Sequence, residues 1–422
     1  MSNRATVFEF TSYKFEPDKK RILFNYKTEY EGKEPMFFTE TVILPSEPNV
    51  KKIPQKLISK LLESLHIILG ISYYKFYCAP KLAFGKPGSR PRSGLGTTKL
   101  QYTGPLSKKE ADFWNIVYKK GLGEFFYKNN LDPETSPKFP YKKGYGPKIT
   151  KSYTLYPKTS SKCLVGIGGG KDSIVTAELL KNGKFDITAF IVQTNADNKI
   201  IEHPRSSRDK ESELIDTIIK KIGVGDLSIK RILDPKVFDN HQYNGHIPIS
   251  AVYAFLGVFT AVLYKYSYFI VGNEYSSNFG NIKYKGLEIN HQWSKSFEFE
   301  KLFQDYLKNF VSPDVFYFSL LRPFYEIRIA KIFSGLKKYF SLFSSCNRNF
   351  RIINRNLSKE EHSNILKNIR MSNKSLWCNE CPKCVFVFTL LSAFLTKREL
   401  LNIFGKNLYE DKNLLPLFKD IL

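Results

Sequence analysis

The stretch from Cys163 to Leu180 constrains the fold more than any other part of this sequence. Cys163 to Ile167 is a short apolar run that predicts a buried strand, and the glycines 168–170 follow it directly. The apolar spacing from Ile174 onward predicts a helix. A strand, a glycine turn and a helix present backbone N–H groups and the positive helix end to a phosphate, which a β-carbon in the turn would hold away. We therefore expect a phosphate-binding loop here.

Two common phosphate-loop patterns do not fit this turn. A Walker A loop needs a glycine at the position of Val165 and a hydroxyl residue after Lys171, where the chain has Asp172. The dinucleotide pattern Gly-x-Gly-x-x-Gly, counted from Gly166, places its last glycine at Lys171. A different class of phosphate loop is therefore required.

The turn resembles the PP-loop of the ATP pyrophosphatases, whose pattern is Ser-Gly-Gly-x-Asp-Ser. The matching residues are Gly168, Gly169, Gly170, Lys171, Asp172 and Ser173. Gly168 stands where the family has its first serine, so one hydroxyl contact to pyrophosphate is missing. The resemblance implies an enzyme that binds ATP, cleaves it between the α and β phosphates and adenylates a substrate.

Strand and helix patterns alternate from residue 160 onward. The predicted strands are 163–167, 187–192, 228–233 and 268–271, and the predicted helices are 172–180, 208–221 and 249–263. This alternation predicts an α/β fold, in which a parallel sheet carries helices on both faces. Ligands of such sheets bind at the carboxyl ends of the strands. Polar residues gather at those ends, including Asn273 and Glu274, as a nucleotide site requires.

Three regions are predicted along the chain. Residues 1–150 form a smaller α+β domain, with strands between 7 and 44, a helix over 56–74 and a second helix that Ser107 caps, with Glu110 three residues on. Residues 151–340 form the nucleotide-binding catalytic domain, after a linker rich in Pro, Gly and Lys. Residues 341–422 form a helical region with a cysteine cluster. Between residues 275 and 330 few regular elements are predicted, and the mixture of polar and aromatic side chains there indicates a substrate-facing segment.

Four cysteines near the carboxyl end predict a metal site. They are Cys346, Cys378, Cys381 and Cys384. Four thiolates with two-residue spacers suit a tetrahedral zinc ion, and an iron–sulfur cluster is also compatible with four cysteines. Cys78 and Cys163 lie in apolar surroundings and are interpreted as core thiols.

Composition narrows the class of protein. Of the 422 residues 42% are hydrophobic, which is typical of globular chains, and the net charge of +25 favours anionic ligands such as nucleotides. No block of five basic residues marks a nucleic-acid arm, so nucleic acid is not the expected partner. The apolar run 247–263 contains Ser250 and Thr260 and ends near Lys265, which favours a buried helix over a membrane span. No signal-like segment opens the chain, and a cytoplasmic protein is expected.

The loop and the cysteine cluster together resemble two families. The 7-cyano-7-deazaguanine synthases carry a similar cysteine pattern, but those chains are much shorter and lack the amino-terminal region. Nearly the whole chain resembles the UDP-N-acetylmuramoyl-L-alanyl-L-glutamate epimerase family of peptidoglycan synthesis. The resemblance is carried by residues 168–173, 272–276, 288–292, 294–300, 317–323, 345–347, 377–378 and 381–384.

The second resemblance implies inversion of the terminal L-glutamate of UDP-MurNAc-L-Ala-L-Glu, with ATP and Mg²⁺ consumed to release AMP and pyrophosphate. A free carboxylate makes the neighbouring Cα–H a very weak acid, and adenylation removes that negative charge. Oxygen ligands suit Mg²⁺, and Asp172 and Glu274 are candidates to hold it. Lys171, Lys295 and Arg322 are candidates to meet phosphates, although Arg322 is equally compatible with an ion pair at the core edge.

Inversion needs a base and an acid on opposite faces of Cα. The candidates are His291, Lys295, Glu298 and Glu300. His291 is favoured because its pKa lies near neutrality, while a structural hydrogen bond is the alternative role for each. Two other functions remain open, namely a PP-loop enzyme that modifies tRNA or a nucleobase, and a nucleotide-binding protein without catalysis.

Overall fold

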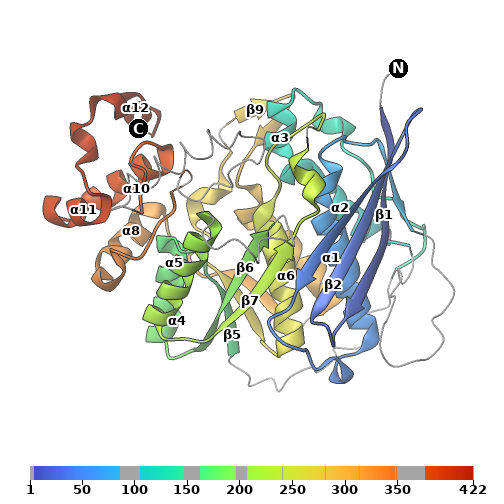
Figure 1. The fold of residues 1–422 in the computed structure, drawn as a ribbon, viewed down its shortest axis with the longest axis horizontal. Coiled ribbons are helices and arrows are strands. Elements are labelled where there is room, and N and C mark those ends of the chain that lie inside the picture. The colour runs from blue at the N-terminus through green and yellow to red at the C-terminus, as the bar shows by residue number, and fades with distance from the viewer. Residues whose placement is uncertain are drawn as a thin grey trace.

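The computed structural model describes residues 4–85, 105–146, 162–195, 207–239, 241–280, 282–312, 314–346, 348 and 376–421 (Figure 1). A nine-stranded sheet runs through it in the order β11-β8-β5-β6-β7-β3-β2-β1-β4. Five neighbouring strands at one end of this order, β11 to β7, pair in parallel with one another. They are β5 (Lys162–Gly166), β6 (Asp186–Asn195), β7 (Asp226–Ile232), β8 (Tyr268–Val271) and β11 (Phe316–Ser319). The predicted α/β fold class, with a parallel sheet and helices on both faces, is confirmed.

The amino-terminal strands extend this same sheet. They are β1 (Ala5–Glu16), β2 (Arg21–Tyr30), β3 (Met36–Ile43) and β4 (Lys81–Phe84). Strand β3 pairs antiparallel with β7, with Thr41 opposite Ile232 and Ile43 opposite Lys230. Backbone hydrogen bonds therefore cross the boundary predicted near residue 150, and the division of the chain into three domains stays a prediction.

One face of the sheet is covered by helices that come mainly from the amino-terminal half. They are α1 (Gln55–Tyr74), α2 (Lys108–Gly121), α3 (Gly123–Lys128), α6 (Ile249–Tyr264) and α7 (Phe297–Tyr306). Leu164, Phe190 and Phe269 of the parallel strands belong to this core. The capping box predicted for α2 is present, because the Ser107 side chain accepts from the backbone N–H of Glu110 and the Glu110 carboxylate accepts from that of Ser107.

The opposite face carries the helices that follow the phosphate loop and those of the carboxyl end. They are α4 (Lys171–Asn182), α5 (Ser207–Ile222), α8 (Glu326–Ser334), α10 (Pro382–Ser392), α11 (Lys397–Phe404) and α12 (Leu415–Ile421). Val165, Ile191 and Ile270 of the strands pack into this second core, because successive residues of a strand point to opposite faces. In Figure 1 the carboxyl-terminal helices, drawn in red, lie beyond α8 on this side.

The predicted buried helix over 249–263 is confirmed as α6, in which Ala251 to Leu263 is almost continuously buried. Among the described residues no helix combines the length and apolarity needed to cross a membrane.

Residues 275–330 contain more helices and strands than the sequence predicted. Helix α7 begins after Ser296, whose side chain accepts from the backbone N–H of Phe299, and a hairpin of β9 (Ile282–Tyr284) and β10 (Leu287–Ile289) precedes it. The Phe-Glu-Phe-Glu run from Phe297 alternates as a strand does, which conceals a helix at the level of sequence.

Candidate active site

The predicted phosphate loop connects β5 to α4 at the carboxyl end of the sheet. Gly169 adopts a φ of +79°, a left-handed conformation that favours glycine, and Gly170 caps α4. The Ser173 hydroxyl lies under the turn, where it donates to the carbonyl of Gly170 at 3.0 Å and accepts from the N–H of Gly168 at 3.4 Å. The loop thus precedes the amino-terminal end of α4, and the positive end of the helix dipole there favours an anion.

A cavity of about 410 Å³ lies against this loop. Its walls combine the loop with the ends of β6 and β8 and the start of α6. The lining includes Gly168, Gly170, Asp172, Ser173, Val192, Ser250, Tyr253, Gly272, Asn273, Lys295 and Tyr317. The lining thus combines polar groups with aromatic and aliphatic groups.

Three carboxylates from distant parts of the chain meet beside the loop. Asp172, Glu274 and Glu326 each offer an oxygen, and these oxygens lie within 4.8 Å of one another. This carboxylate trio can hold a metal ion, since hard cations prefer oxygen ligands. The predicted pair Asp172 and Glu274 is thus brought together, and Glu326 is a third member that the sequence analysis missed. Its only sequence signal is an acidic residue in the first turn of a helix, shortly after a strand of the sheet.

Lys171 is buried and bonded to the trio. Its Nζ lies 2.5 Å from Asp172 Oδ1, and it also forms an ion pair with Glu326. Burial alone would lower the pKa of Lys171, but the two carboxylates raise it overall. The pKa of Glu326 is raised by burial and by the charge of Asp172, against the opposing effect of Lys171. The site therefore carries an excess of negative charge, which one lysine only partly neutralises.

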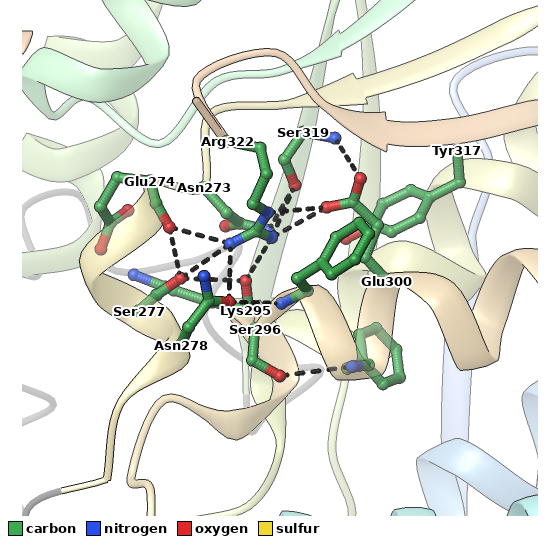
Figure 2. Close-up of polar contacts among 12 residues, drawn as sticks. Asn273, Glu274, Ser277, Asn278, Lys295, Ser296, Glu300, Tyr317, Ser319 and Arg322 are labelled. Atoms are coloured by element: carbon green, nitrogen blue, oxygen red, sulfur yellow. Dashed lines mark hydrogen bonds and ion pairs between the residues drawn. The ribbon is translucent and has the colours of Figure 1, made fainter. Parts of the chain in front are cut away.

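Arg322 lies at the centre of a network of hydrogen bonds (Figure 2). Its guanidinium donates to the backbone carbonyls of Glu274 at 2.8 Å and Lys295 at 2.6 Å, and forms an ion pair with Glu300 at 2.8 Å. Glu300 also accepts from the backbone N–H of Ser319 at 3.2 Å. Of the two roles left open for Arg322, the structure shows the ion pair. That pair joins the loop after β8 to α7 and to the end of β11.

The four acid–base candidates occupy different surroundings. Lys295 lines the cavity beside the glycine loop. Glu300 is buried and bonded to Arg322, whereas Glu298 is half exposed, pairs with Lys120 at 2.5 Å and accepts from the indole of Trp293 at 2.7 Å. Partial burial lowers the pKa of His291, with an opposing contribution from Glu124. Lys295 is the candidate that the structure brings to the cavity, and the catalytic roles of all four stay predictions.

The four predicted metal ligands converge. The sulfurs of Cys346, Cys378, Cys381 and Cys384 lie within 4.8 Å of one another. The Cys378 and Cys384 sulfurs are 3.7 Å apart, those of Cys381 and Cys384 are 3.5 Å apart, and the Cys378 backbone N–H donates to Cys346 Sγ at 3.4 Å. Such a set of four sulfurs fits a metal ion, which the cluster can bind.

This cysteine cluster lies beside the phosphate loop. The backbone N–H of Ser344 donates to the carbonyl of Gly169 at 3.2 Å. Ser344, Ser345 and Cys346 share the lining of one hollow with Gly168 and Gly169. The loop and the cluster belong to separate predicted regions of the chain, and only the folded chain shows that they are in contact.

Comparisons with known proteins identify relatives of this chain. The chain matches the MurL N-terminal domain over residues 1–320 and the MurL C-terminal domain over residues 342–422. It is 31% identical to the UDP-N-acetyl-alpha-D-muramoyl-L-alanyl-L-glutamate epimerase of a Micromonospora species, covering 99% of this chain and 82% of the relative. Proteins of the same name match from Xanthomonas oryzae pv. oryzae (33% identity, 88% of this chain, 71% of the relative) and Salinispora tropica (30%, 99% and 80%).

Among solved structures, the chain is similar to the U34-tRNA thiolase NcsA from Methanococcus maripaludis with its [4Fe-4S] cluster. The TM-score is 0.28 at 14% identity, with 60% of this chain and 79% of that chain covered. The matches to both MurL domains and to three relatives over most of their length establish that this chain belongs to the MurL family.

Proposed function

We propose that this protein inverts the terminal L-glutamate of UDP-MurNAc-L-Ala-L-Glu, at the expense of ATP. The names of the relatives at 30–33% identity support the substrate and the inversion. The observation that carries the use of ATP is the arrangement of the site, in which the glycine loop and Asp172, one member of the carboxylate trio, line one cavity at the carboxyl edge of the sheet.

The nucleotide is assigned to the 410 Å³ cavity, with its phosphates against residues 168–173. The trio of Asp172, Glu274 and Glu326 is assigned to Mg²⁺, which neutralises polyphosphate charge when bound. Lys171 already pairs with two of these carboxylates, so its ammonium is held at the position where the phosphates arrive. The amino-terminal end of α4 adds its dipole to the same place.

The chemistry follows from the charge of the substrate. The α-carboxylate attacks the α-phosphate of ATP and displaces pyrophosphate. The acyl-adenylate that forms has lost the negative charge next to Cα, which makes the Cα–H far more acidic. A base then removes this proton, and an acid returns one to the opposite face. Lys295 is proposed as one member of this pair, because it lines the cavity in which the acyl-adenylate forms. Hydrolysis of the adenylate releases AMP and the D-isomer.

The test is incubation of the protein with ATP, Mg²⁺ and UDP-MurNAc-L-Ala-L-Glu, followed by acid hydrolysis, chiral analysis of glutamate and an AMP assay. D-glutamate in step with AMP supports the proposal. Lys295→Met should still release pyrophosphate but form little D-glutamate, while Lys301→Met, on the exposed side of α7, serves as the control. AMP without D-glutamate would refute the inversion, and D-glutamate without AMP would refute the role of ATP.

We propose zinc as the ion of the cysteine cluster. Ligands that share one tetrahedral ion at a Zn–S distance of about 2.3 Å lie about 3.8 Å apart, close to the 3.5 and 3.7 Å found for two sulfur pairs. In an iron–sulfur cube each thiolate binds a different iron, which spaces the sulfurs further apart. Elemental analysis should find about one zinc per chain, and Cys381→Ser should lose it while Cys78→Ser keeps it. Iron with acid-labile sulfide in the purified protein would overturn this assignment.

A further inference from the structure

A second hollow lies on the other side of the carboxylate trio. It has a volume of about 390 Å³. It is lined by Glu274, Ser276, Gln292, Tyr325, Glu326, Ile327, Lys383, Phe386 and Leu390. Two of these residues, Glu274 and Glu326, belong to the trio, whereas the nucleotide cavity is lined by its third member, Asp172. The trio thus separates two hollows, and a group that enters the second one can approach the phosphates of a nucleotide in the first.

Lys383 is the one cation among the described residues that line this hollow. Its side chain is half-buried, and within the described ranges no carboxylate lies at ion-pair distance from its Nζ. Its ammonium lies over the ring of Phe386, with Nζ 5.7 Å from the ring centroid. Lys171 forms ion pairs with two carboxylates, whereas Lys383 has no carboxylate partner among the described residues. A half-buried ammonium without an anionic partner favours the arrival of an anion.

The cysteine cluster holds Lys383 in this position. The residue stands between Cys381 and Cys384, in the first turn of α10, and Pro382 starts that helix. Cys381 and Cys384 are almost completely buried, so the backbone on both sides of Lys383 is anchored while its side chain extends into the hollow. This explains how a cluster outside the sheet contributes a side chain to the site.

The remaining lining suits a short aliphatic chain that ends in an anion. Ile327, Phe386 and Leu390 supply apolar walls, and Ser276 and Gln292 supply neutral hydrogen-bonding groups. A glutamate has this shape, with two methylenes between Cα and the side-chain carboxylate. Its α-carboxylate must reach the nucleotide, whereas the γ-carboxylate needs a separate positive partner.

We propose that the second hollow binds the side chain of the terminal glutamate and that Lys383 pairs with its γ-carboxylate. The inference rests on the proposed function and deepens it, because it names the part of the site that selects glutamate. Lys383 is a specificity-determining residue in this arrangement, and the trio and loop perform the adenylation on the other side.

The test compares UDP-MurNAc-L-Ala-L-Glu with the analogue that ends in L-glutamine, whose γ-carboxylate is replaced by a neutral amide. The wild-type enzyme should prefer the glutamate substrate by about 10- to 100-fold in kcat/KM, the range for one charged hydrogen bond. Lys383→Met should raise KM for the glutamate substrate by a similar factor, leave KM for ATP within about twofold and remove most of the preference. Lys383→Arg should recover part of it, because the positive charge is restored.

Two controls separate this role from a structural one. Zinc content of the Lys383 variants should equal that of the wild type, and Lys397→Met, which removes an exposed lysine of α11, should leave both KM values unchanged. If the wild-type enzyme inverts glutamate but uses the amide equally well, the assignment of Lys383 is wrong and the proposed function stands, whatever the variants do. If the wild-type enzyme yields no D-glutamate from either substrate, both proposals fail.

Discussion

Glu326 lies far from the phosphate loop in the chain and next to it in space. It is held by an ion pair with buried Lys171, and that lysine also pairs with Asp172. The three groups therefore form one charged unit in which each carboxylate limits the position of the other. Loss of any member changes the net charge beside the glycine loop.

Glu326→Gln should reduce the release of AMP by about 10- to 100-fold, because the change removes one of three carboxylates that can hold Mg²⁺. The fold of the variant should be preserved, since the amide of glutamine is nearly isosteric with the carboxylate of glutamate. Steady-state AMP assays across a range of Mg²⁺ concentrations check this, and Glu410→Gln, at an exposed ion pair, is the control. Full activity of Glu326→Gln at low Mg²⁺ would contradict the assignment of the trio.

His66 makes a pH prediction for the amino-terminal core. Its ring lies among Phe10, Tyr13 and Tyr26, and burial lowers its pKa to about 3. The folded protein keeps this ring neutral, while the unfolded chain protonates it below its ordinary pKa of about 6.5. The contribution of His66 to the free energy of unfolding is therefore fully present above pH 6.5. It decreases by about 1.4 kcal/mol per pH unit as the pH falls from 6.5 toward 3.

Urea unfolding of wild type and His66→Gln between pH 7 and pH 4.5 tests this prediction. The variant should be less stable at pH 7 but should lose less stability on acidification. Parallel curves for the two proteins would show that another group governs the acid sensitivity. His241→Gln, in the loop before α6, is a matched control on an imidazole that is only partly buried.

At the scale of elements, the site depends on how closely β8 approaches the first turn of α4. Gly272 follows β8, and a β-carbon there would lie 2.6 Å from Thr176 Oγ1 and 2.9 Å from the backbone oxygen of Asp172. The Thr176 hydroxyl in turn donates to that same oxygen at 2.8 Å. The strand end and the helix start are thus in direct contact, and that contact positions Asp172.

Gly272→Ala should displace the first turn of α4 and lower AMP release by about 10- to 100-fold, a loss typical of a misplaced supporting group. Its thermal midpoint should fall by a few degrees at most, since one local contact changes. Gly225→Ala provides the control, because a β-carbon at that glycine meets nothing within 4 Å. Equal AMP release by both alanine variants would show that activity does not depend on the close approach of Gly272 to the first turn of α4.

At the scale of the whole molecule, one buried ion pair spans the junction between the amino-terminal strands and the parallel sheet. Arg231 of β7 bonds to Glu40 of β3 at 2.5 Å and to the Ser72 hydroxyl at 2.7 Å, and both charged side chains are almost completely buried. The junction is therefore specified by complementary charge as well as by backbone pairing. A buried pair of this kind is costly to break on one side.

Arg231→Met should lower the free energy of unfolding by about 3–5 kcal/mol, because it leaves Glu40 charged and unpaired in the core. The double variant Arg231→Met/Glu40→Leu should recover a large part of that loss, since both charges are gone. Urea denaturation measures both values. A double variant no more stable than Arg231→Met would show that packing, and not the uncompensated charge, sets the cost.

Features that depend on neighbours in the chain could be predicted from the sequence. The glycine turn, the capping box at Ser107 and the alternation of strands and helices arise from local preferences and from burial periods of two or 3.6 residues. The cysteines could be grouped for the same reason, as three of the four lie within seven residues. The MurL family pattern combined such local signals along the whole length.

Three features were decided only by the tertiary structure. They are the junction of β3 with β7, the addition of Glu326 to the carboxylate trio, and the contact of Ser344 with Gly169. Each joins residues that lie far apart in the chain, and no periodicity records which distant partners will meet. The ion pair of Arg322 with Glu300 was open for the same reason. Residue types and spacing therefore determine which groups are available for chemistry, whereas the packing of the sheet edges and helix ends determines which of them share a site.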